Sequence, residues 1–209
     1  MTHEILPLEH GAILEWVRKG STVLDLGCGN GELLSLLVRD KDVRAQGIEI
    51  DEHAIYQCVA KGLSVFHEDI DQGLSGYGDK SFDYVILNQS LQQVKKLDAV
   101  VKEALRVGRK VIIGFPNFAH YDARVQIFFR GRAPVTPSLP YEWHDSPNLH
   151  FLSISDFIDY CRQRKISIEA SSFFGRKHAV RLFPNLFAMV GIFLVSNGTK
   201  NEGDPTVMI

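Results

Sequence analysis

Three acidic side chains carry the first chemical signal in this sequence. Asp25 lies inside the apolar run 23–26, Glu49 lies near the end of a second strand-like run at 44–50, and Asp69 lies near the end of a third at 65–70. A carboxylate in such a place is costly to bury unless a hydrogen-bond donor or a cation meets it. The three positions suit an ammonium group at Asp25, ribose hydroxyls at Glu49 and an adenine amino group at Asp69. Two alternatives stay open, because Asp25 could only brace the amides of the next turn and Glu49 could be a surface acid.

Three glycines follow the first of these runs at alternate positions, Gly27, Gly29 and Gly31. Glycine adopts positive φ and leaves the backbone bare, so a ligand can lie against such a turn. The dinucleotide-binding pattern is G-x-G-x-x-G, whose helix N-terminus faces a pyrophosphate. Here the third glycine comes one residue early and Glu32 replaces the last one, with a charge that would oppose a diphosphate. The turn therefore favours an adenosine ligand without phosphate over the cofactor of an NAD-dependent oxidoreductase. Cys28, within the turn, is expected to pack behind it.

Apolar periodicity indicates the elements that must position these residues. It predicts helices at 10–19, 32–38, 52–61, 97–107, 125–129 and 156–164, and strands at 23–26, 44–50, 65–70, 82–88, 110–115, 166–173 and 186–195. Alternating strands and helices are typical of a parallel, doubly wound sheet, in which ligands bind at the carboxyl ends of the strands. Asn88 ends one such strand, and Asn88, Gln89 and Ser90 should line the same crevice as Gly27. Gln92 and Gln93 are expected to face solvent.

Four segments together resemble motifs I to IV of the class I S-adenosylmethionine-dependent methyltransferases. They are VLDLGCGNGELL at 23–34, GIEID at 47–51, EDI at 68–70 and FDYVILNQSLQQV at 82–94, in the family order and at workable separations. Segments 13–21, 115–124, 139–151 and 181–187 resemble, more narrowly, the MetW family of bacterial methionine-biosynthesis proteins. The resemblance covers roughly residues 5 to 196.

The resemblance implies an α/β fold, a single doubly wound Rossmann-like sheet of seven mostly parallel strands with helices on both faces. It implies one domain at 1–196, with an irregular loop or lid at 131–151 and a flexible tail at 197–209. S-adenosylmethionine is the implied cofactor. The positions that match its binding motifs are Asp25, Gly27, Cys28, Gly29, Asn30, Gly31, Glu49, Ile50, Asp69, Ile70, Asn88 and Gln89. Asn30 departs from the family, which often has Asp there.

A methyl transfer to oxygen or nitrogen needs a group that receives a proton. His120, Tyr121 and His144 are candidates, with Asp122 or Asp145 to orient the histidines, although ordinary hydrogen bonding explains them equally well. No metal is expected, because the histidines and acids of 120–150 lack metal-ligand spacing. Asn117 follows the strand 110–115, where many methyltransferases bind their acceptor.

The MetW resemblance implies a role beside the homoserine O-acyltransferase, as a partner or an activator, and the aromatic loop at 131–151 offers a docking surface. S-adenosylmethionine could then be a sensed end product. The alternative is a stand-alone methyltransferase of a small molecule, so whether the chain is an enzyme stays open.

Composition limits the partners and the cellular compartment that we expect. The 209 residues suit one α/β domain, and 23 basic against 25 acidic side chains give a formal net charge of −2. We therefore expect neither nucleic acid nor a membrane surface as a partner. Three cysteines and the lack of a long apolar segment favour the reducing cytoplasm.

Overall fold

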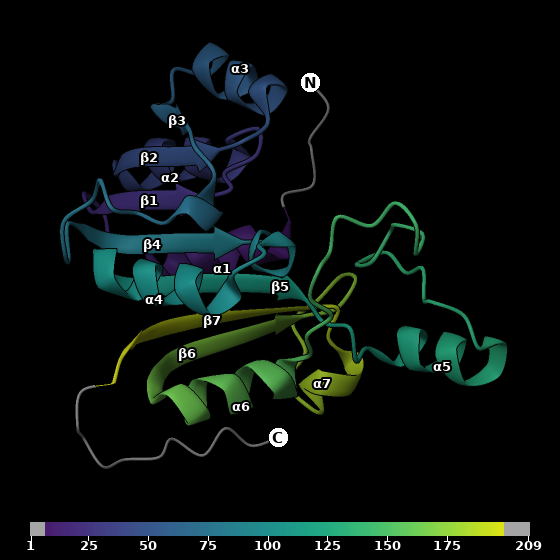
Figure 1. Cartoon of the computed structure of the whole chain (residues 1–209). Helices are drawn as coiled ribbons and strands as arrows, with labels where there is room; N and C mark the ends of the chain where they lie inside the picture. Colours follow the sequence, from purple (N-terminus) through teal and green to yellow (C-terminus); the bar gives the residue numbers. More distant parts are fainter. Residues whose placement is uncertain (1–6, 199–209) are drawn as a thin grey trace.

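A seven-stranded sheet organises the chain, as a computed structural model that describes residues 7–198 shows (Figure 1). The strand order is β3-β2-β1-β4-β5-β7-β6, and every neighbouring pair is parallel except the two that involve β7. The strands are β1 (Thr22–Leu26), β2 (Arg44–Glu49), β3 (Val65–His67), β4 (Phe82–Asn88), β5 (Gly108–Pro116), β6 (Ile166–Phe174) and β7 (Val190–Asn197). The strand order reverses between β1 and β4. The predicted doubly wound, mostly parallel sheet is confirmed.

Helices cover both faces of this sheet. They are α1 (Leu8–Trp16), α2 (Glu32–Lys41), α3 (Glu52–Ala60), α4 (Leu97–Val107), α5 (Tyr121–Arg130), α6 (Ile154–Arg164) and α7 (Pro184–Phe187). Helices α1, α2 and α3 bury their apolar side chains in one core cluster, and α4 and α6 bury theirs in a second cluster on the opposite face. Burying apolar area on both faces is the main force that holds a sheet of this kind together.

The turn after β1 follows from its glycines. Gly27, Gly29 and Gly31 all have positive φ, at 77°, 53° and 74°. A Cβ on Gly31 would lie 2.5 Å from Leu63 Cδ1 and 2.7 Å from Cys58 Sγ, so only glycine lets α2 begin this close to α3. Helix α3 in turn is capped by Asp51, whose carboxylate accepts a hydrogen bond from the amide of Ala54.

Three local predictions were wrong. Strand β3 ends at His67, and Ile70–Gln72 forms a 3₁₀ turn instead of continuing the strand. The predicted strand 186–195 begins only at Val190, because Pro184 at a first helical position starts the short helix α7. Gln92 is buried rather than solvent-facing, and its side-chain amide donates to the Gln89 carbonyl.

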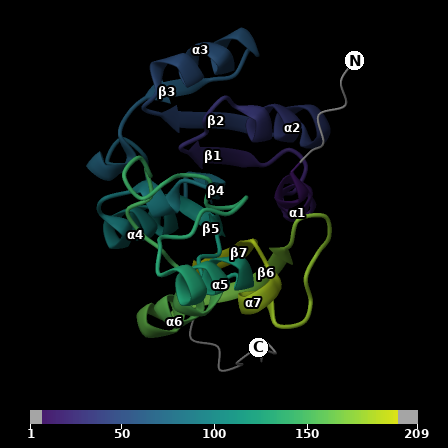
Figure 2. The ribbon, with the colours of Figure 1, turned by 90° about the vertical axis from the view of Figure 1, so that its right-hand side faces the viewer.

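Helix α5 and the stretch 131–153 depart from the layered body. Figure 1 shows α5 standing away from the sheet, joined to β5 by the short segment 117–120 and to α6 by the long stretch 131–153, and Figure 2 views the molecule from the side on which α5 lies. No helix or strand lies between Arg130 and Ile154. At the other end, β7 runs through Asn197, one residue into the predicted tail, and the rest of that prediction, at 199–209, lies outside the described residues.

Candidate functional site

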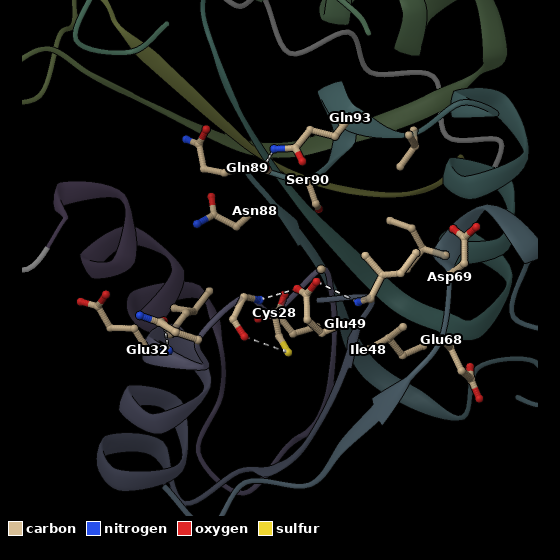
Figure 3. Close-up of a pocket in the computed structure, with 18 of the residues that line it drawn as sticks. Cys28, Glu32, Ile48, Glu49, Glu68, Asp69, Asn88, Gln89, Ser90 and Gln93 are labelled. Atoms are coloured by element: carbon tan, nitrogen blue, oxygen red, sulfur yellow. Dashed lines mark hydrogen bonds between the residues drawn. The ribbon is translucent and has the colours of Figure 1, made fainter. Parts of the chain in front are cut away.

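A cavity of about 650 Å³ opens at the carboxyl ends of β1, β2 and β4, where the strand order reverses. Its wall comes from the glycine turn, the ends of β2 and β4, the stretch 68–71 and the start of α1. In Figure 3, Glu32 lies towards one end and Asp69 towards the other, with Cys28 and Glu49 between them. The cavity therefore runs across the ends of adjacent strands.

Glu49 connects the glycine turn to the end of β2. One of its carboxylate oxygens accepts a hydrogen bond from the amide of Gly29 at 2.8 Å, and the other accepts from Ile50 at 2.8 Å and Asp51 at 3.0 Å. These bonds fix the carboxylate at the wall of the cavity. A carboxylate has about four lone-pair positions, so a diol ligand still finds acceptors there.

Asp25 is buried beneath the turn, with 3% of its surface exposed. Burial, and next the negative charge of Glu49, raise the pKa of this carboxyl to about 7. The site therefore disfavours the ionised form, which an unperturbed aspartate would adopt at neutral pH. A cationic ligand group beside Asp25 would stabilise it.

The thiol of Cys28 packs behind the turn as expected. A Cβ on Gly47 would lie 2.6 Å from its sulfur, so Gly47 makes room for it. Burial raises the pKa of the thiol, which keeps it protonated and unreactive.

The opposite wall is the end of β4, and it holds polar atoms with no partner among residues 7–198. Asn88 Oδ1 and Ser90 Oγ are buried without a hydrogen bond. Gln89 has a φ of 61°, which is uncommon for a residue with a side chain. A Cβ on Gly27 would lie 2.8 Å from Ser90 Cβ, so the glycine turn and this wall are in close contact. Strained backbone and unsatisfied polar groups of this kind cluster at ligand sites.

Eleven of the twelve residues predicted to bind a cofactor line this one cavity. Gly31 is the exception, since it caps the start of α2. Ser90 and Glu32, which the sequence also placed beside the ligand, line the cavity too. Lining residues that sequence reasoning missed are Pro7, Glu9, His10, Leu33, Ile48, Glu68, Asp71, Gln93, Val94 and Lys95. Several of these are neighbours of predicted residues and could have been found by extending each motif. Glu9 and His10 could not, because α1 reaches the cavity only through the tertiary fold.

The three candidate catalytic residues lie elsewhere. His120 and Tyr121 line a second cavity with Phe187, at the start of α5. His120 caps that helix, because its Nδ1 accepts from the amide of Asp122 at 3.3 Å, and burial lowers its pKa. His144 has 56% of its side chain exposed and pairs with Glu142 at 3.6 Å. Asn117 is fully buried and bonds to the carbonyls of Asn185 and Ala188, so it connects segments of the fold.

Comparison with known families gives a direct assignment. The family model described as "Methionine biosynthesis protein MetW" matches residues 8–195. The chain belongs to the MetW family. A bifunctional methionine biosynthesis protein MetXA/MetW from Rhodopirellula baltica is 36% identical to it over 200 residues, which are 88% of this chain and 32% of that protein. A 27-O-demethylrifamycin SV methyltransferase from Amycolatopsis mediterranei is 32% identical over 99 residues, which are 44% of this chain and 36% of that protein. The MetW-family chain thus spans about a third of the length of the curated relatives it matches.

Solved structures with the same fold include S-adenosylmethionine-dependent methyltransferases. One from Thermotoga maritima has a TM-score of 0.66 at 17% identity, covering 90% of this chain and 87% of its own. Another from Archaeoglobus fulgidus has a TM-score of 0.61 at 15% identity, covering 90% of each chain. This MetW-family chain therefore has the class I methyltransferase fold. Among residues 7–198, every helix is too short or too polar to cross a lipid bilayer.

Proposed function

We propose that this chain binds S-adenosylmethionine and acts in methionine biosynthesis together with the homoserine O-acyltransferase. The observation that carries the proposal is the relative in Rhodopirellula baltica, which joins MetXA and MetW in one bifunctional protein. A fused relative indicates that the two activities benefit from proximity, because a tether raises the effective concentration of one domain near the other.

The cavity fits the cofactor on three grounds. Glu49 presents a fixed carboxylate for the ribose hydroxyls, and Asp69 lies at the neighbouring strand end for the adenine amino group. Asp25 provides a buried acid that a ligand cation would satisfy. Bare backbone at Gly27 and Gly29 lets a ligand approach closely. Bound S-adenosylmethionine would supply an activated methyl group at its sulfonium.

The part of the cavity nearest the expected methyl group favours binding over catalysis. That part is the end of β4, where Asn88, Gln89 and Ser90 are weak proton acceptors, and the imidazole in the cavity wall, His10, belongs to α1. His120, Tyr121 and His144 lie outside the cavity. We therefore propose that the chain senses S-adenosylmethionine. Binding of this end product of methionine metabolism would then change the activity of the acyltransferase.

The docking surface that we propose for the acyltransferase is α5 with the loop 131–151. Phe128 is 81% exposed, Phe129 is 76% exposed and Trp143 is 80% exposed. An apolar cavity of about 490 Å³ lies between α5 and the loop, with Phe118, Leu139 and Phe151 in its wall. Large exposed apolar side chains beside an apolar hollow are typical of protein interaction sites, because water leaves both when a partner binds.

A binding assay with the purified acyltransferase from the same cell tests the partnership. We expect co-elution in gel filtration and an acyltransferase activity that changes when this chain and S-adenosylmethionine are added. Phe128→Asp should abolish co-elution, whereas Tyr56→Asp, at a 68% exposed position on α3, should not. Unchanged acyltransferase activity and no co-elution of the wild-type proteins would refute the partnership.

A stand-alone methyltransferase of a small molecule is the second candidate. It is supported by the 32% identity to the rifamycin methyltransferase over 99 residues, although that match covers less than half of this chain. Release of S-adenosylhomocysteine from S-adenosylmethionine in the presence of a metabolite extract, and without the acyltransferase, would favour this candidate.

A further inference from the structure

His10 is the lining residue that neither the motifs nor the family match assigns to a task. It lies in α1, 8% of its surface is exposed, and it lines the cavity. Its Nδ1 atom is buried and has no hydrogen-bond partner among residues 7–198. A buried imidazole nitrogen without a partner is costly, and such atoms in native proteins commonly have a ligand.

The strand order tells which end of the cavity His10 occupies. Asp69 follows β3 at the edge of the sheet, Glu49 ends β2, and the glycine turn follows β1. Helix α1 packs with α2 over the far side of this row, in the core cluster that also contains side chains of β4, β5 and β7. A nucleoside held by Asp69 and Glu49 must therefore extend its amino-acid part towards β4 and α1, where His10 lies.

Most backbone amides of the glycine turn are not free to bind a ligand. The amides of Gly27 and Cys28 donate to the carbonyl of Ile48, and the amide of Gly31 donates to Cys28. The amide of Gly29 donates to Glu49, and that of Glu32 donates to the Asn30 side chain. These five amides of the turn are thus already engaged and offer little to an anionic ligand group.

The charges at this end make a donor more necessary. Asp25, Glu9 and Glu32 all line the cavity, and the last two act electrostatically on His10. Three carboxyl groups attract the ammonium group of an amino acid but repel its carboxylate. An imidazole N–H among them would offset that repulsion with a charge-assisted hydrogen bond.

We propose that His10 donates a hydrogen bond to the α-carboxylate of the amino-acid part of S-adenosylmethionine. This inference rests on the proposed binding of that cofactor. His10 would then make the site specific for the complete amino-acid nucleoside, while Asp69 and Glu49 hold only its nucleoside half.

Calorimetric titration with two ligands tests this role. S-adenosylmethionine has the carboxylate, and decarboxylated S-adenosylmethionine keeps the ammonium and sulfonium groups but lacks it. We expect the wild-type protein to prefer the complete cofactor by at least about tenfold, as a hydrogen bond to a charged group would give. His10→Ala should lose that preference by weakening only the complete cofactor, and His10→Asn, which keeps an N–H donor, should recover part of it. Asp69→Ala is the matched control and should weaken both ligands equally.

Three results would overturn the inference. If His10→Ala and His10→Asn weaken both ligands to the same extent, the imidazole does not act on the carboxylate. If the wild-type protein binds both ligands equally well, the site does not recognise the carboxylate although the proposed function survives. If the wild-type protein binds neither ligand, the proposed function fails together with the role of His10.

Discussion

The buried carboxyl of Asp25 makes the stability of this protein depend on pH. Replacing this residue by asparagine removes that contribution and so allows it to be measured. The group is 3% exposed, and its pKa in the folded chain is raised from 3.8 to about 7, first by burial and then by Glu49. Folding therefore favours the protonated form. The stability that this proton provides is complete below about pH 4, declines as the pH rises towards 7, and is absent above that value.

The size of the effect follows from the pKa values. One pKa unit corresponds to about 1.36 kcal/mol, so a rise from 3.8 to about 7 corresponds to about 4 kcal/mol between acid and alkaline limits. Asp25→Asn keeps the shape of the side chain and cannot ionise. The free energy of unfolding of Asp25→Asn minus that of the wild-type protein should therefore increase with pH by about this amount. A destabilisation by the amide that does not depend on pH would leave this increase unchanged.

Urea unfolding of both proteins at a series of pH values from 4 to 8, without ligand, measures this difference. Titrations that the two proteins share cancel when their free energies of unfolding are subtracted. Glu49→Gln removes the second cause of the raised pKa and should move the transition to lower pH. A difference between wild type and Asp25→Asn that stays constant from pH 4 to 8 would refute the reasoning.

Three further substitutions test the site and its connections. Gly27→Ala should lower the free energy of unfolding by at least about 1 kcal/mol more than Gly29→Ala. Both glycines have positive φ, but only a Cβ on Gly27 meets a neighbour, Ser90 Cβ at 2.8 Å. Urea unfolding measures both values, and equal losses would contradict this reasoning. Asn117→Ala should destabilise by about 3 kcal/mol, since it leaves the carbonyls of Asn185 and Ala188 without their donor, and thermal unfolding with an unchanged midpoint would contradict it. His150→Ala removes the side-chain hydrogen bond to Val94 and leaves the two backbone bonds to Gln92. It should therefore weaken, without abolishing, the effect of S-adenosylmethionine on acyltransferase binding, and each ligand alone should bind within about twofold of wild type. Calorimetry with both ligands measures this coupling, and a coupling equal to that of the wild-type protein would contradict the prediction.

Local patterns predict those parts of the structure that depend on neighbouring residues. The apolar runs of β1 and β5 are bounded by glycine or proline, and burial on both faces leaves these runs and that of β4 little alternative to a central strand. The order of the strands also explains why the residues predicted to bind a cofactor lie close together. Parallel strands bring their carboxyl ends to one edge, so residues at the ends of β1, β2 and β4 had to meet once the sheet formed.

Long-range contacts decide the parts that the sequence could not predict. Gln92 is buried because its backbone carbonyl accepts hydrogen bonds from the backbone amides of Leu149 and His150, more than fifty residues away in the sequence. His120 caps α5 and so takes a structural task that its residue type does not reveal. The α7 turn was predictable in principle, since Pro184 favours a first helical position, but the apolar residues after it suggested a strand.

The same long-range contacts connect the proposed docking surface to the cofactor cavity. The loop that begins beside α5 ends at Leu149 and His150, whose amides donate to Gln92 at 2.8 Å and 3.0 Å, and the His150 Nε2 donates to the carbonyl of Val94 at 2.9 Å. Gln93 and Val94 line the cavity. A partner that moves the loop would therefore pull on the cavity wall through three hydrogen bonds, and a ligand that orders the wall would hold the loop. Reciprocal coupling of this kind needs only that each ligand favours one arrangement of the shared segment. A sensing role consequently requires no catalytic residue in the cavity, which is consistent with the position of His120, Tyr121 and His144 outside it.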